Sequence, residues 1–268
     1  MRASLRALLL AAALAASLLT ACQNRDRSLY DDAEKLWLND QHDEAISKLQ
    51  LLVTEYPSSL LVSKSLFRLG EIYYLNLRDH VKALDYFIRV TEREGLTELN
   101  LQAHRYIADI YEGSVRDYDL AILQYQKILN NFRSLVQPGE YQLAIGRAYF
   151  RKGDYRQAII ELEALLNDNS KSPFALDARY QIANCHQLLG QRTQAIEMYE
   201  RMAEDYPGSK YDYDIRLALG VSYEEMDNLE KAAQVYQAME RDYPDRELIA
   251  RRLESTRKRI GSRRPAGR

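Results

Sequence analysis

The chain is poor in the residues that cross-link, bind metals or break helices. Its 268 residues include 2 cysteines, 4 histidines, 6 prolines and 11 glycines. Two cysteines exclude a disulfide-stapled scaffold, and the low glycine and proline content excludes collagen-like and low-complexity chains. After the N-terminal stretch, no apolar run reaches the roughly 20 residues that span a bilayer. The 46% apolar composition instead predicts a folded chain with a large core.

Sequence patterns that carry catalysis are missing as well. There is no glycine-rich phosphate loop and no nucleophile elbow. We expect His42 and His80 in inter-helix turns, His104 alone on a helix and His186 at a core position. None of the four has a partner at metal-ligand spacing. We therefore expect no enzyme activity, no metal or other cofactor, and no small-molecule substrate.

The first 21 residues have the layout of an export signal. Arg2 and Arg6 form a positive segment, an apolar stretch of mostly alanine and leucine follows over 8–19, and Leu-Thr-Ala-Cys closes it at 19–22. This tetrapeptide resembles the bacterial lipobox, and the resemblance implies a signal peptide of residues 1–21 and a diacylglycerol on Cys22. The alternative is an ordinary secretory signal that ends beside a cysteine.

The residues behind Cys22 bear on its destination. In the lipoproteins that this segment resembles, an aspartate there retains the protein at the inner membrane. Gln23 and Asn24 stand there instead, which implies the outer membrane, facing the periplasm. The linker 22–28 gives a leash of about 20 Å at roughly 3.3–3.6 Å per residue, so the first repeat should lie close to the bilayer. An acylated Cys22 cannot pair with Cys185, which we expect to be a small core residue.

Charge is distributed unevenly along the chain. Residues 251–268 hold eight Lys or Arg and one acid, a net charge of +7, whereas residues 22–250 carry about −11. The basic end either complements the dipole of a last helix and then continues into solvent, or binds anionic lipid, cell-wall polymer or an acidic partner. Nucleic acid is not an expected partner, because the protein is exported and lacks a basic face interleaved with aromatics.

One residue pattern recurs six times. An alanine opens the second helix of each predicted hairpin, with successive separations of 38, 38, 37, 37 and 37: Ala45, Ala83, Ala121, Ala158, Ala195 and Ala232. A constant period of this size is typical of repeat architectures, in which each unit buries its apolar face against its neighbours.

The fourth repeat shows the pattern most clearly. Gly146 and Tyr149 share one face of the first helix. The Gly153-Asp154 pair ends that helix and separates it from the second. Ala158 and Leu162 face inward on the second helix. In the first, fifth and sixth repeats a proline follows the alanine by twelve residues and should end the second helix: Pro57, Pro207 and Pro244. The second and third repeats lack that proline and have one extra residue between tyrosine and alanine.

This arrangement of small residue, tyrosine, alanine, aromatic and proline resembles the tetratricopeptide repeat. The resemblance covers residues 29–245 and implies an all-α fold, a right-handed α-solenoid of six helix hairpins with a concave inner face. Residues 246–260 are expected to form a capping helix and residues 261–268 a basic disordered tail.

The same resemblance implies where partners bind. In such proteins the first helix of each hairpin supplies the contacts, from three positions around the small residue. Those positions hold Tyr30, Glu34, Trp37, Phe67, Glu71, Tyr74, Arg105, Asp109, Glu112, Leu143, Arg147, Phe150, Tyr180, Asn184, Gln187, Leu217, Val221 and Glu224. The acids Glu34, Glu71 and Asp109, flanked by aromatics, suit a segment with basic and apolar side chains. Alternatively, the aromatics pack between repeats and the acids are solvated. The Lys and Asn that clamp a carboxylate in chaperone-binding members are absent.

An acylated cysteine before such repeats is similar to the lipoprotein subunit of the outer-membrane β-barrel assembly machinery. That subunit family has about five less regular repeats, whereas six occur here. The Tyr-Pro stops are equally similar to periplasmic repeat proteins of the Tol–Pal system, and pilus or secretin assembly lipoproteins share the architecture. These resemblances imply a scaffold for envelope proteins. The rival interpretation is a passive tether between membrane and cell wall that uses the basic tail.

Overall fold

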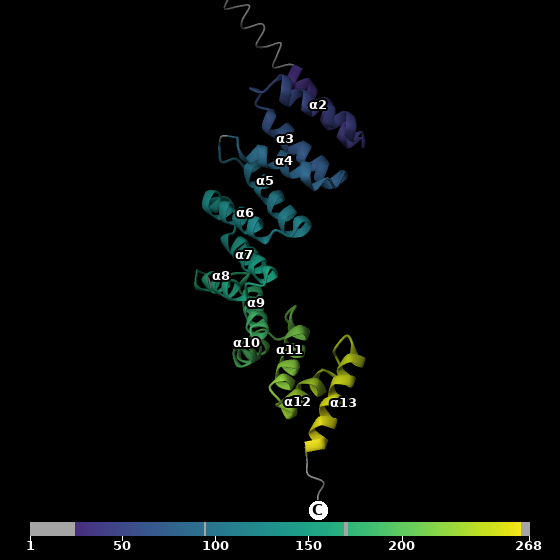
Figure 1. Cartoon of the computed structure of the whole chain (residues 1–268), viewed down its shortest axis with the longest axis vertical. Helices are drawn as coiled ribbons and strands as arrows, with labels where there is room; N and C mark the ends of the chain where they lie inside the picture. Colours follow the sequence, from purple (N-terminus) through teal and green to yellow (C-terminus); the bar gives the residue numbers. More distant parts are fainter. Residues whose placement is uncertain (1–24, 94, 169–170, 264–268) are drawn as a thin grey trace, which may run out of the picture. The chain divides into compact units, whose positions relative to one another are not determined.

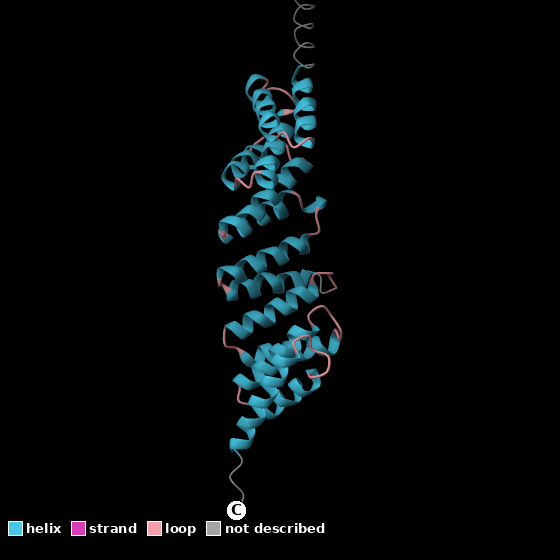
Figure 2. Ribbon diagram, turned by 90° about the vertical axis from the view of Figure 1, so that its right-hand side faces the viewer, coloured by secondary structure: helices cyan, strands magenta, loops and turns pink. Residues whose placement is uncertain are grey.

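The structure is a computed structural model that describes residues 25–93, 95–168 and 171–263. The expected signal peptide, the expected lipidation residue Cys22 and residues 264–268 lie outside the described residues. Within the three ranges every regular element is a helix, drawn in cyan in Figure 2. The predicted all-α class is therefore confirmed.

The chain divides into two compact units between Leu135 and Val136. The described part of the first unit contains three hairpins and is coloured purple to teal in Figure 1. Their elements, in chain order, are a helix over 25–38, α2 (His42–Glu55), α3 (Val62–Glu71) with η1 (Ile72–Asn76), α4 (His80–Thr91), α5 (Glu98–Asp109) with η2 (Ile110–Val115), α6 (Tyr118–Asn131) and the short η3 (Arg133–Leu135).

The second unit continues the same order of helices and ends in an additional one. Its elements are α7 (Pro138–Lys152), α8 (Tyr155–Asp168), α9 (Ala175–Leu188), α10 (Arg192–Asp205), α11 (Asp212–Glu225), α12 (Leu229–Met239) and α13 (Arg246–Arg263). Consecutive helices of each unit pack against one another, so each hairpin buries its apolar faces on its neighbours.

The six periodic alanines all lie in the core. Each of them is 0% exposed. Three repeats pair the alanine with a glycine on the first helix, and a Cβ on Gly70, Gly146 or Gly220 would lie 2.6, 2.5 or 2.3 Å from Phe87, Leu162 or Tyr236. Each of these larger side chains comes four residues after an alanine. The small position therefore exists because a large side chain of the second helix lies directly over it.

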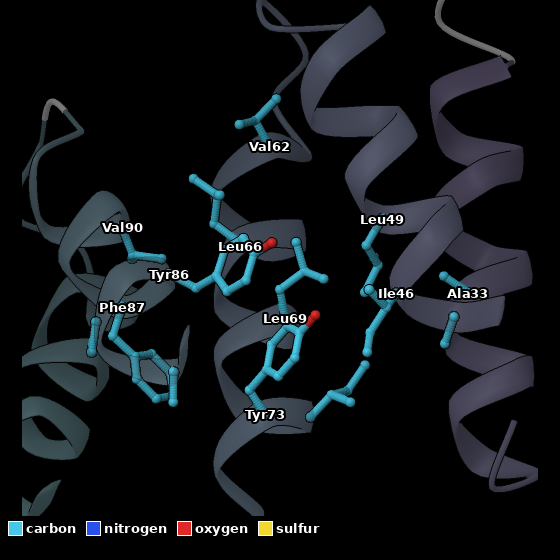
Figure 3. Close-up of a cluster of buried hydrophobic side chains, with 14 of the residues drawn as sticks. Ala33, Ile46, Leu49, Val62, Leu66, Leu69, Tyr73, Tyr86, Phe87 and Val90 are labelled. Carbon is cyan, nitrogen blue, oxygen red and sulfur yellow. The ribbon is translucent and has the colours of Figure 1, made fainter. Parts of the chain in front are cut away.

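Figure 3 shows how this packing builds the core of the first unit. Ala33, Leu49, Leu69 and Phe87, from four successive helices, are each 0% exposed and belong to one cluster. In the second unit Cys185 is likewise 0% exposed, and burial raises the pKa of its thiol to about 12. The expectation that Cys185 is a core residue is confirmed.

Each hairpin turns through one residue with a left-handed backbone. These residues, with φ between 55° and 87°, are Asp40, Arg78, Arg116, Gly153, Gly190 and Asp227. Each lies five residues before one of the six alanines, so the turn repeats with the same period as the core. His42 and His80, expected in the turns, are instead the first residues of α2 and α4, because the left-handed residue completes the reversal before them.

The extra residue of the second and third repeats is absorbed at the end of the first helix. There the helix widens into the π-helical elements η1 and η2. The Asp79 N–H bonds to the Tyr73 carbonyl at 2.8 Å, six residues back, whereas the Asp154 N–H of the fourth repeat reaches Tyr149, five residues back, at 3.0 Å. A π-turn holds one more residue than an α-turn, so the hairpin register survives the insertion.

Several helix ends differ from the expectations. The helix over 25–38 begins inside the expected linker 22–28. α2 and α10 end two residues before Pro57 and Pro207, as the restriction on residues before proline predicts, but α12 ends at Met239, five residues before Pro244. The capping helix α13 begins at the expected residue and continues three residues beyond Ile260. Residues 261–263 are therefore helical, although they were expected in the disordered tail.

Candidate partner-binding face

The predicted contact residues of the first two repeats meet around one arginine. The Arg68 guanidinium on α3 donates to both carboxylate oxygens of Glu34, at 2.7 and 2.9 Å, and to Glu71 at 2.6 Å. The same guanidinium lies 3.9 Å from the centroid of the Trp37 ring. Forked donation to a carboxylate combined with stacking on an aromatic face uses both properties of the guanidinium. Arg68 thus fixes the side chains of two repeats in one arrangement.

Trp37 is oriented by a second contact. Its indole N–H donates to the Asn76 side-chain oxygen at 3.1 Å, and Asn76 is the last residue of the π-helical η1. The π-turn therefore presents Asn76 to the first repeat. Tyr30 lies on the same helix face, and burial together with Glu34 raises the pKa of its hydroxyl above the ordinary value. Both aromatics remain partly exposed.

Tyr106 of α5 joins the third repeat to this face. Its ring centroid lies 5.8 Å from that of Phe67 and 5.6 Å from that of Tyr74. Its hydroxyl donates to Glu71 at 3.3 Å, and burial with the nearby Glu71 carboxylate raises its pKa to about 12. Phe67 and Tyr74 therefore pack between repeats, which is the alternative interpretation of these aromatics, and they still leave part of their rings exposed.

The acids of the first unit are not equivalent. Glu34 and Glu71 already share Arg68, and burial raises the pKa of Glu71 although Arg68 beside it favours the charged form. Asp109 is the exposed residue of the three. Burial of its carboxylate and then the nearby Glu112 raise its pKa, although Arg105 beside it favours the charged form. Glu112 accepts the Tyr125 hydroxyl at 2.5 Å. The three acids Glu34, Glu71 and Asp109 are therefore not equally available to a partner, because Arg68 already neutralises the first two.

In the second unit the predicted residues bridge neighbouring repeats. Arg147 donates to Asp177 at 2.8 Å, and Asp177 also accepts Lys210 at 2.8 Å and the Tyr211 hydroxyl at 2.7 Å. Burial alone would raise the pKa of Asp177, but the bonds from Lys210 and Tyr211 hold it below the ordinary value. Tyr180 stacks on Tyr211 with centroids 4.0 Å apart.

Further predicted residues of this unit are also engaged. Asn184 accepts the Tyr199 hydroxyl at 2.6 Å, and Gln187 accepts the Ser222 hydroxyl at 2.6 Å. Glu224 accepts Tyr236, Arg252 and Thr256 at 3.0, 2.8 and 2.6 Å and so holds α13 in place. Phe150 packs on Tyr155 with centroids 5.4 Å apart, and Leu217 and Val221 are half-buried.

The prediction that Leu143 contacts a partner is wrong. Leu143 is 4% exposed and lies in a core cluster with Leu162 and Ile182. Its position was inferred from spacing on α7, but α7 packs against both α8 and α9, and that face is covered. Conversely, Arg68 and Tyr106 were not among the predicted residues, although Arg68 stands three residues before Glu71, a spacing that favours a pair on a helix.

The pattern that the hairpins display matches a known family profile. The tetratricopeptide-repeat profile matches residues 7–59, 64–94, 140–172, 177–209 and 214–246, more than half of the chain. The chain belongs to the tetratricopeptide-repeat family. Its third repeat, from α5 to α6, lies outside the matched segments, although it forms a helix hairpin like the others. The third repeat therefore keeps the hairpin and its buried Ala121 although the family profile does not match it.

Solved structures of tetratricopeptide proteins are similar in fold. YrrB, described as having an unusual peptide-binding site, aligns with a TM-score of 0.51 at 17% identity, over 77% of this chain and 97% of its own. A repeat protein from Parabacteroides merdae gives 0.53 at 15% over 87% and 99%. The pilus biogenesis factor PilW gives 0.52 at 15% over 86% and 97%. No curated protein matches the chain in sequence.

Across the described ranges, no three His, Cys, Asp or Glu side chains gather in a way that could hold a metal ion. None of the described helices combines the length and apolar character that crossing a membrane requires. Interaction with other proteins is the activity that this family of repeats supports.

Proposed function

We propose that this chain is a lipid-anchored periplasmic scaffold that binds segments of envelope proteins during outer-membrane protein assembly. The observation that carries the proposal is the face around Arg68. Trp37, Tyr74 and Tyr30 are held there by contacts between repeats and remain partly exposed. Rigid aromatic side chains lose little conformational freedom on binding, which is why they dominate protein interfaces.

The chemistry of this face indicates the kind of segment bound. Glu34 and Glu71 are compensated by Arg68, whereas Asp109 is exposed. Asp109 lies near Tyr74, and burial together with the Asp109 carboxylate raises the pKa of the Tyr74 hydroxyl. A segment with apolar side chains for the aromatics and one basic side chain for Asp109 fits best. Such a segment belongs to a protein partner, and the proposed lipid anchor places that partner in the cell envelope.

The proposed anchor comes from the sequence. Leu-Thr-Ala-Cys at 19–22 supports a lipid on Cys22, and Gln23 and Asn24 support the outer membrane. Because the first helix is present from residue 25, the first repeat lies near that lipid. Cys22→Ser should release the protein into the soluble periplasm, and continued membrane retention would contradict the anchor.

The passive tether is less well supported. It requires the basic C-terminal residues to be available for lipid or cell wall. Arg259 and Arg263 both bind Asp227, the left-handed residue of the sixth hairpin, so part of this charge holds α13 against its own unit. Deletion after Ala250 would therefore be expected to destabilise the sixth repeat as well as remove charge.

In-cell photocrosslinking tests the scaffold. A photoreactive amino acid is placed at Tyr74, at Phe150 and, as a control, at the exposed Val81, and the adducts are identified by mass spectrometry. We expect β-barrel assembly components or nascent outer-membrane proteins at Tyr74. Crosslinks to pilus, secretin or Tol–Pal components would mean that the scaffold works in those systems instead. The same adducts at Tyr74 as at the control position would contradict binding at this face.

A further inference from the structure

One edge of the first unit brings an exposed leucine beside the start of the described chain. The turn between α2 and α3 contains Leu60, whose residue exposure is 96%. The hydroxyl of Ser59, its neighbour, donates to the carboxylate of Asp26 at the start of the first helix. Asp26 is 8% exposed, so this hydrogen bond is largely shielded from solvent. It holds the turn next to the first residues of the helix over 25–38.

That contact limits how far Leu60 can lie from Cys22. Three residues lie between Cys22 and Asp26, so the four residue-to-residue steps, at roughly 3.3–3.6 Å each, span at most about 14 Å. Each headgroup region of a bilayer is about 5–8 Å thick. A lipid-bearing sulfur at the level of the glycerol groups therefore keeps Leu60 within reach of the headgroups.

The surroundings of Leu60 suit a lipid surface. A shallow hollow of about 500 Å³ beside it is lined by Ser58, Ser59, Leu60, Ser63, Glu92 and Arg93. Serine hydroxyls and the Arg93 guanidinium can donate to phosphate oxygens. Leu96, in the next turn between repeats, is 66% exposed. Arg25, Lys64 and Arg93 are exposed on this edge, against the exposed acids Glu55 and Glu92.

Exposure alone does not single out this edge. Leu38, at the other end of the first helix, is 74% exposed. About 20 Å of helix separates residue 38 from residue 25 at 1.5 Å per residue. What distinguishes Leu60 is its position beside the chain end that leads to Cys22.

We infer that Leu60 inserts into the headgroup region of the bilayer that holds the lipidated Cys22, so that the edge formed by residues 56–61, 92–93 and 95–97 faces the membrane. This inference rests on the proposed lipid anchor. One leucine adds little binding by itself, but once the lipid confines the chain it sets the orientation of the first unit. The face around Arg68 then stands at a fixed angle to the membrane.

A pair of labelled variants tests this orientation. The full-length lipidated protein, with Leu60→Cys or the matched control Leu38→Cys, is labelled with the fluorophore NBD; Cys185 is buried and Cys22 is acylated. Both proteins are reconstituted into vesicles of phosphatidylethanolamine and phosphatidylglycerol. Flotation measures membrane attachment, and the NBD emission maximum and iodide quenching measure insertion. Thermal melts of both variants verify folding.

The outcomes separate the orientation from the anchor. We expect both proteins to float, with a blue-shifted emission and a roughly threefold lower quenching constant for the label at 60 only, as burial in the interface requires. If both float and the two labels behave alike, the orientation is overturned while the anchor stands. If the lipidated protein does not float, the anchor fails and the orientation fails with it. If the vesicles leave the label at 60 open to iodide and only added envelope protein reduces its quenching, the edge is a protein interface and the orientation is overturned.

Discussion

The guanidinium of Arg68 lies 3.9 Å from the centre of the Trp37 ring while it donates twice to Glu34 on the same neighbouring helix. One side chain of the second repeat thus determines the rotamers of two side chains in the first. The pair lies on the face proposed for binding, so the contacts that stabilise the first unit also fix the side chains of that proposed face.

Replacing Arg68 by Ala should destabilise the first unit. The change leaves Glu34 and Glu71, both largely buried, facing each other without a cation. Since these side chains keep some solvent contact, we expect a loss of about 1–3 kcal/mol in the free energy of unfolding. Urea titration measures it. Arg89→Ala is the control, because the Arg89–Asp85 pair is exposed and should contribute little. Equal effects of the two substitutions would contradict a structural role for Arg68.

Ala158→Trp should overpack the contact between α7 and α8. Ala158 is 0% exposed, and inserting a large side chain into a filled core costs about 1–3 kcal/mol or more. A thermal melt of the variant should therefore shift to lower temperature. Ile160→Trp, two residues away at a position 57% exposed, should melt like the parent chain. An unchanged melt for Ala158→Trp would mean that the repeat register is wrong.

Arg116→Gly should stabilise the third hairpin. Arg116 has φ 60°, a conformation that costs an ordinary residue about 1–2 kcal/mol but costs glycine little sterically. Glycine also gives the unfolded chain more freedom, which offsets part of this advantage. We therefore expect the free energy of unfolding, measured by urea titration, to rise by about 0.5–1 kcal/mol. The reciprocal change Gly153→Ala, at φ 87° in the fourth hairpin, should lower stability. A loss for Arg116→Gly would show that its side chain makes a larger contribution than its backbone costs.

Asp177 should make the second unit sensitive to acid. Its pKa is lowered in the folded state, so the folded chain holds the carboxylate charged more strongly than the unfolded chain does. The stabilisation is present above the unfolded value of about 3.9 and is lost as the pH falls through the folded value. Asp177→Asn should therefore melt below the parent chain at pH 7, and the difference should shrink below about pH 4.

The control for Asp177 is Asp205→Asn, since Asp205 is exposed at the end of α10. It removes the same charge without removing the contacts to Lys210 and Tyr211. Thermal melts from pH 7 to pH 3 compare the three chains. A constant difference between the parent chain and Asp177→Asn across this range would show that the carboxylate charge does not stabilise the fold.

Much of the repeat framework could be predicted from residue spacing. The six alanines and the buried Cys185 were placed correctly, because a helix converts sequence spacing directly into a face. The third hairpin was predicted from Ala121 although the family profile does not match it. Spacing could not show that an extra residue would enter a π-turn, since a longer loop would have preserved the period equally well.

The candidate face was predicted less completely. Its positions on the first helices followed from the repeat, but the state of each side chain depends on neighbours about 35 residues away. Arg68 reaches Glu34 across 34 residues, and Tyr106 reaches Glu71 across 35. Leu143 was misplaced for the same reason, because α9 covers it. Helical spacing identifies a face, but it does not say which charges on that face are already paired.

By itself the sequence determined the helical class, the period of the repeats and the buried small residues, because these depend on local spacing and composition. Tertiary structure alone decided that Arg68 compensates two of the three acids, that Arg78 and Arg116 take left-handed turns, and that Leu60 lies beside the start of the first helix. The physical reason is that ion pairing, ring stacking and exposure depend on distances between repeats, which form only when successive hairpins pack.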